Sequence, residues 1–161
     1  MESIKHPIVK AIVAALEVEL ETCLRSARAA HAEATDEQSK AENKYDTRGL
    51  EASYLVEAQI CQANEVKQSI QRFQSLPLAD FGSDDPINLG AVVELEQAGK
   101  TTTYFIGPRA GGVEITHRGR EIIVITPNSP IGQLLVGQKT GARLRLTVRG
   151  GSKECRITSV A

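Results

Sequence analysis

The first half of the chain repeats apolar positions at alternating spacings of four and three residues. The first run is Val9, Val13, Leu16, Leu20, Cys23, Ala27, Ala30 and Ala34, and the second is Ala52, Val56, Gln59, Ala63, Val66, Ile70 and Phe73. This heptad spacing places each run on one seam of a helix. Two such helices joined by a short connection predict an antiparallel coiled coil over residues 1–76. Alanines gather toward the connection, so we expect the helix axes to approach closely there.

The connection between the two helices carries acidic residues. The sequence Ser39-x-x-Glu42 fits a capping box, which predicts a turn near 35–39 and a second helix from around Lys40. We call residues 35–46 the tip, because they would lie at the far end of the coiled coil. The carboxylates predicted there are those of Asp36, Glu37, Glu42 and Asp46. Such residues are usually solvated, and the cap alone would explain Glu42.

After Leu76 the pattern changes to short runs bounded by glycine and proline. Residues 77–86 contain two prolines and several turn formers, and they predict a linker. The following strands are expected at 91–95, 101–106, 121–125, 143–148 and 155–160. A short helix is predicted within 129–137, with Ser129 as its cap, Pro130 at its first position and Gly137 closing it. Residues 87–161 therefore predict a small, mostly antiparallel α+β domain.

Composition narrows the classes of function. The chain has 161 residues and a formal net charge of −1, so overall charge favours neither nucleic acid nor a membrane surface. It has no Trp, three Tyr and three Phe, too few to line an aromatic ligand pocket. No signal peptide or membrane-spanning run is expected. Three widely spaced cysteines favour reduced thiols in a cytoplasmic protein. Two complementary helices within one chain favour a monomer.

Several motifs of the second half are similar to those of a known family. Residues 104–107 (Tyr-Phe-Ile-Gly) and 126–141, which begin Thr-Pro-Asn-Ser-Pro-Ile-Gly-Gln, resemble the FKBP-like domain of the Gre transcript-cleavage factors of bacterial RNA polymerase. An antiparallel coiled coil followed by a small β domain is also the layout of that family. The resemblance covers nearly the whole chain. A prolyl isomerase function is not expected from the FKBP-like fold, because fold does not carry function.

The resemblance implies a partner and a mechanism. The β domain would dock on the rim of RNA polymerase through Asn128, Ser129, Pro130 and Ile131, and the coiled coil would enter the secondary channel. The tip carboxylates would help a second Mg²⁺ bind at the polymerase's active site, with Glu42 and Asp46 sharing that ion only in the complex. The tip would meet the RNA 3′ end there. The protein would itself be no enzyme and would hold no cofactor when free; the polymerase would hydrolyse the backtracked RNA.

The tip departs from the family pattern Asp-x-x-Glu-Asn followed by Tyr. Glu42-Asn43 and Tyr45 fit it, but Ser39 stands where the family has an acid. Either the turn brings Asp36 or Glu37 into place, or Asp46 substitutes, or cleavage is lost. The leading hypothesis is therefore a factor that stimulates Mg²⁺-dependent cleavage of backtracked RNA. The alternatives are a cleavage-inactive regulator that occupies the secondary channel, and a plain coiled-coil interaction module.

Overall fold

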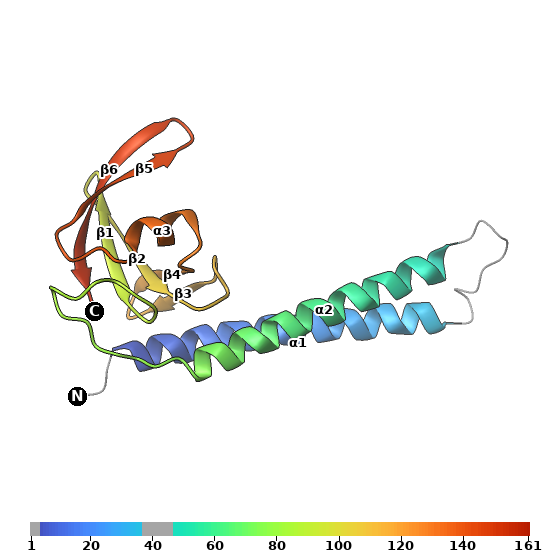
Figure 1. The fold of residues 1–161 in the computed structure, drawn as a ribbon. Helices are drawn as coiled ribbons and strands as arrows, with labels where there is room; N and C mark the ends of the chain where they lie inside the picture. Colours follow the sequence, from blue (N-terminus) through green and yellow to red (C-terminus); the bar gives the residue numbers. More distant parts are fainter. Residues whose placement is uncertain (1–3, 37–46) are drawn as a thin grey trace. The chain divides into compact units, whose positions relative to one another are not determined.

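The structure, a computed structural model, describes residues 4–36 and 47–161. The described elements follow the order predicted from the sequence, with two long helices first and then strands interrupted by one short helix (Figure 1). The helices are α1 (Lys5–Thr35), α2 (Arg48–Gln74) and α3 (Pro130–Leu135). The strands are β1 (Val92–Gln97), β2 (Lys100–Ile106), β3 (Glu114–His117), β4 (Arg120–Ile125), β5 (Arg143–Val148) and β6 (Gly151–Val160). This α+β architecture confirms the predicted fold class.

The two predicted helical seams are confirmed by burial. On α1 the buried seam residues include Leu16, Cys23 and Ala27, and on α2 they include Ala63 and Val66. Small side chains at these positions let two helices pack at close range. The remaining seam positions are buried or half-buried. The heptad pattern therefore identified the contact between α1 and α2 correctly.

The predicted start of the second helix is wrong. The helix α2 begins at Arg48, and Thr47 lies just before it, outside the helix. The Thr47 carbonyl accepts the first helical bond from the Glu51 N–H at 2.9 Å, and the Thr47 hydroxyl donates to the Glu51 carboxylate at 2.9 Å. Gly49 therefore lies in the first turn of α2. The Ser39–Glu42 capping box lies outside the described residues.

In the described ranges the strands form one sheet in the order β3-β4-β2-β1-β6-β5. Neighbouring strands pair antiparallel except β2 and β4, which run parallel from Thr103 opposite Ile122. Two hairpins turn through a residue followed by glycine, both with positive φ: Ala98 with Gly99, and Arg118 with Gly119. That geometry matches the right-handed twist of the flanking strands. Strand β3, which the sequence did not predict, pairs with β4 through the second of these turns.

Both faces of the sheet are covered at its centre. On one face α3 packs over the sheet, with Leu135 buried among Val93, Ile106 and Ile157 (Figure 1). On the other face the ring of Phe73, near the end of α2, lies 6.2 Å from the ring of Phe105 between centroids. The last turn of α2 therefore packs against the sheet.

The chain divides into two compact units, and each helix contributes to both. The first unit combines Met1–Ala15 with Gln71–Ala161, and the second is Leu16–Ile70. We call Lys5–Ala15 of α1 together with Gln71–Gln74 of α2 the helix base, and the described remainder of the two helices the arm. The helix base belongs to the same unit as the sheet. The predicted division at residue 76 instead places both helices wholly in the first domain. In the described residues, no helix is both long and apolar enough to span a membrane.

Candidate functional site

The tip carboxylates are mostly outside the described residues. Glu37, Glu42 and Asp46 fall in 37–46, so their predicted convergence stays a prediction. Asp36 is described: it follows the last residue of α1, it is exposed, and its N–H donates to the Glu33 carbonyl at 3.4 Å. Within 4–36 and 47–161, no group of three or more His, Cys, Asp or Glu side chains could hold a metal ion. Mg²⁺ sites usually combine one or two protein carboxylates with other ligands, so Asp36 by itself does not form one, and the shared Mg²⁺ stays a prediction.

The described ends of the arm enclose a small hollow beside the tip. It has a volume of about 200 Å³ and lies between the last turn of α1 and the first turn of α2. Its lining is Glu33, Arg48, Glu51, Ala52 and Leu55. Acidic and basic side chains both line it, so the local charge is mixed rather than strongly acidic.

The element expected to dock on the partner is a capped helix start. The Ser129 side chain accepts from the Gly132 N–H at 3.0 Å and donates to the Thr126 carbonyl at 2.7 Å, so it closes the first turn of α3 from both sides. Pro130 occupies the start of the helix, where its missing N–H costs nothing. The cap and the proline position are confirmed.

The same element presents some of its side chains to solvent and holds others inward. Asn128 and Pro130 are exposed, whereas Ser129 is half-buried by its capping bonds. Ile131 is half-buried and packs against the core of the sheet. Leu134, on the next turn, is one of the exposed large apolar residues. Asn128, Pro130 and Leu134 are therefore available to a partner, while Ser129 and Ile131 also shape the loop.

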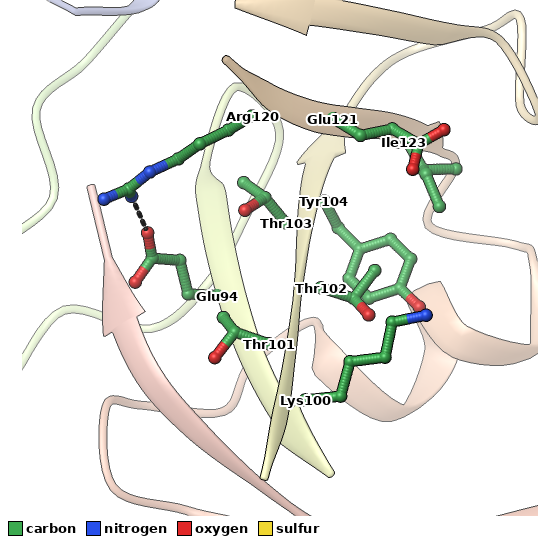
Figure 2. A pocket seen from close by; sticks show the side chains of 9 residues that line it. All are labelled: Glu94, Lys100, Thr101, Thr102, Thr103, Tyr104, Arg120, Glu121 and Ile123. Atoms are coloured by element: carbon green, nitrogen blue, oxygen red, sulfur yellow. Dashed lines mark hydrogen bonds and ion pairs between the residues drawn. The ribbon is translucent and has the colours of Figure 1, made fainter. Parts of the chain in front are cut away.

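A second hollow, of about 620 Å³, lies along β2 and was not predicted from the sequence. Figure 2 shows its lining, which comes from β1, β2 and β4: Glu94, Lys100, Thr101, Thr102, Thr103, Tyr104, Arg120, Glu121 and Ile123. Parallel pairing of β2 with β4 begins only at Thr103, so the first residues of β2 border the hollow. No motif in the sequence marks it, because its residues meet only through strand pairing.

Charges in the hollow along β2 largely offset one another. The Arg120 guanidinium donates to the Glu94 carboxylate at 2.6 Å, across β2 (Figure 2). The Arg120 side chain is 71% exposed and that of Glu94 27%, so this ion pair is partly solvated. Burial, with a smaller effect from Cys155, raises the pKa of the Tyr104 hydroxyl. The hollow thus combines opposite charges with hydroxyl groups and favours no single class of ligand.

One comparison with known proteins matches the part of the chain that forms the sheet and α3. A family model described as "Transcription elongation factor, GreA/GreB, C-term" matches residues 82–161, which contain the whole sheet and α3. The chain belongs to the GreA/GreB family. This confirms the resemblance first seen in the residues around Asn128 and Pro130.

Other relatives of this GreA/GreB family member were found among curated proteins and solved structures. Two curated relatives, each named transcription inhibitor protein Gfh1, come from two strains of Thermus thermophilus; both are 28% identical over 128 residues, covering 77% of either chain. The crystal structure of Gfh1 from Thermus thermophilus is 22% identical, with 92% and 94% of the two chains covered and a TM-score of 0.39. That of Thermus aquaticus Gfh1 is 23% identical, with 94% of each chain covered and a TM-score of 0.41. Because these TM-scores are low, the fold description rests on this chain's own elements.

Proposed function

We propose that this GreA/GreB family member binds RNA polymerase, places its arm in the secondary channel and inhibits transcription without stimulating transcript cleavage. The observation that carries the proposal is the pair of curated relatives, both named transcription inhibitors and aligned over 77% of the chain. The altered tip supports it independently, since Ser39 replaces the first acid of the family pattern.

The chemistry of the tip favours inhibition over cleavage. Two-metal hydrolysis of a phosphodiester needs the second metal ion, and a factor can promote its binding only by adding negative charge beside it. Ser39 supplies a neutral hydroxyl, and Lys40 and Lys44 add positive charge close to Glu42 in the sequence. A Mg²⁺ ion shared with the polymerase would therefore be attracted less strongly than by the family's usual acids.

The described surface of α3 fits the docking half of the proposal. Asn128 and Pro130 are exposed on a loop that the Ser129 cap holds in one conformation. A preformed loop binds with a smaller loss of conformational entropy than a flexible one. The contact with polymerase would then pair a rigid docking loop with an arm that reaches a separate site.

The first experiment compares RNA synthesis and RNA cleavage in the same preparation of polymerase. Promoter-dependent synthesis should fall as the protein is added, and transcripts in a stalled, backtracked complex should not shorten from their 3′ ends. Inhibition should weaken when the docking loop is altered by Asn128→Ala with Pro130→Ala. Acceleration of 3′ shortening by the unaltered protein would refute the inhibitor proposal. Failure to bind polymerase at all would leave the third class, a plain coiled-coil interaction module.

Cleavage stimulation is the second candidate, and Glu42-Asn43 with Tyr45 favours it because they keep the family frame. It requires shortening by the natural sequence and its loss in a Glu42→Ala, Asp46→Ala double variant. The matched control removes two exposed acids from the helices, Glu17→Ala with Glu57→Ala, and should leave cleavage unchanged. Equal cleavage in both double variants would remove Glu42 and Asp46 from the mechanism.

The change Ser39→Asp distinguishes the two candidates further. Under the inhibitor proposal this substitution restores the family's first acid, and we expect it to produce measurable 3′ shortening where the natural sequence gives none. If neither protein shortens the transcript, other tip residues, such as Lys40 and Lys44, must set the outcome. Binding to polymerase serves as the control, because a single tip substitution should not alter docking by α3.

A further inference from the structure

The predicted linker, residues 77–86, is attached to the helix base through one buried lysine. Lys5, in the first turn of α1, is only 1% exposed. Its ammonium group donates a hydrogen bond to the Ala79 carbonyl and lies 4.2 Å from the centre of the Phe81 ring. Lysine is rarely buried unless its charge is compensated. The compensation here comes from a carbonyl and an aromatic face that lie 74 and 76 positions later in the sequence.

Neighbouring contacts hold the rest of residues 77–86 in place. Phe81 packs against the core of the sheet, so the ring above Lys5 is itself fixed. After Phe81 the chain turns, with the Gly82 N–H donating to the Asp85 carboxylate at 2.8 Å. The residue that follows these ten, Ile87, is bonded on both sides, donating to the Gln138 carbonyl and accepting from Gly137, each at 2.8 Å. Gln138 and Gly137 lie just after α3.

We propose that Lys5 is a positioning residue that fastens residues 77–86 to the first turn of α1 and so joins the helix base to the sheet as one cooperative body. The two ends of residues 77–86 are held in different ways. Ile87 holds its end by backbone bonds that any residue could make, whereas near the other end Lys5 supplies the side-chain contacts from α1 to Ala79 and Phe81. Because the Ala79 carbonyl and the Phe81 face both meet that ammonium, removing it leaves both without this contact.

Charge and burial at Lys5 act in opposite directions. Burial lowers the pKa of Lys5, and the nearby Asp80 carboxylate offsets part of that effect. Replacing a buried charged group by an apolar one of similar length need not reduce global stability. The decisive consequence is therefore local: without the ammonium, residues 78–82 should open more often while the sheet stays closed.

Amide hydrogen exchange of the free protein tests the proposal. In Lys5→Met, the amide of Gly82, whose N–H donates to the Asp85 carboxylate, should exchange about tenfold faster, which corresponds to ~1.4 kcal/mol of local opening free energy. Amides of Ile87 and Gly137 should remain as protected as in the unaltered protein. The matched control is Lys10→Met, which removes an exposed lysine from the same helix and should change nothing. Lys5→Arg, which keeps a cationic donor, should restore part of the protection.

Two further outcomes keep the test decisive. Unchanged exchange at the Gly82 amide in Lys5→Met would overturn the proposal, as would uniform acceleration over the whole chain, which would indicate a general structural role. If Lys5→Met fails to fold, Phe81→Leu tests the same contact from the other side and should accelerate exchange at the same amide. None of these readouts requires polymerase, so the proposal stands or falls separately from the proposed function.

Discussion

Truncation of Phe73 offers a quantitative test of the conclusion that the helix base belongs to the core of the sheet. Phe73 is 1% exposed, and its ring lies 6.2 Å from that of Phe105 with a tilt of 37°. The ring occupies space that Gly107 leaves open: a Cβ on Gly107 would lie 2.8 Å from Phe73 Cζ. A cavity bordered by backbone collapses poorly, so the cost of truncation should be near the top of its usual range.

We therefore expect Phe73→Ala to lower the free energy of unfolding by about 4 kcal/mol, within the 3–5 kcal/mol typical of buried Phe→Ala changes. Tyr54→Ala is the matched control, because Tyr54 is an aromatic residue of the same helix that is 61% exposed. Its effect should stay within about 0.5 kcal/mol. Urea unfolding followed by circular dichroism suits this chain, which has no Trp to report by fluorescence.

A double-mutant cycle with Gly107 makes the test specific. Gly107→Ala alone should cost about 1–3 kcal/mol, because its new methyl group meets the Phe73 ring and Val124. In the Phe73→Ala background the ring is gone, so the same glycine change should cost clearly less. Strict additivity, or a loss below about 1 kcal/mol for Phe73→Ala, would refute the packing of the helix base on the sheet.

Three other outcomes follow from described contacts. Gly132→Ala should lower the melting temperature strongly, since its Cβ would lie 1.9 Å from the Thr126 carbonyl oxygen; Gly111→Ala, whose Cβ would meet Thr126 only at 3.5 Å, should not. Thiol labelling of the native protein should modify the exposed Cys61 fast and the buried Cys155 slowly, since burial raises the pKa of the Cys155 thiol. Because a raised pKa means that the folded state binds the proton more tightly, stability from this thiol is lost as pH rises above the ordinary thiol pKa of about 9. Cys155→Ala should therefore lose less stability than the unaltered protein as the pH is raised through that alkaline range.

The helical pattern predicted the seam of the arm but not the second buried side of the helix base. Lys5, Ile8 and Ile12 are each almost fully buried, and they lie beside the predicted seam at spacings of three and four. Those spacings were present in the sequence. They were missed because a coiled coil needs only one seam per helix, whereas the helix base also packs within the unit that contains the sheet.

Strand β3 was missed for a different physical reason. It has only four residues, and its hairpin turn uses Arg118 with φ of 52° where Asn or Gly would normally signal such a turn. Sheet pairing with β4 stabilises a conformation that Arg118 would not favour by itself. The hollow along β2 was hidden for a related reason, because Glu94 and Arg120 meet only after strand pairing brings them together.

The residues that decide the fold and those that decide the activity are separate in this chain. The fold depends on buried seams, on Phe73 and on glycines such as Gly132 that lie against backbone, whereas the match to the GreA/GreB family model covers residues 82–161. Under the proposed function, inhibition and cleavage stimulation would differ by a few acidic residues of the tip, none of which is a predicted seam position. The proposed function therefore places the choice between the two activities in the tip rather than in the core. It follows that Ser39→Asp should alter transcript cleavage while the urea midpoint stays the same. Phe73→Ala should lower the urea midpoint and leave transcript cleavage unchanged at temperatures where the variant remains folded.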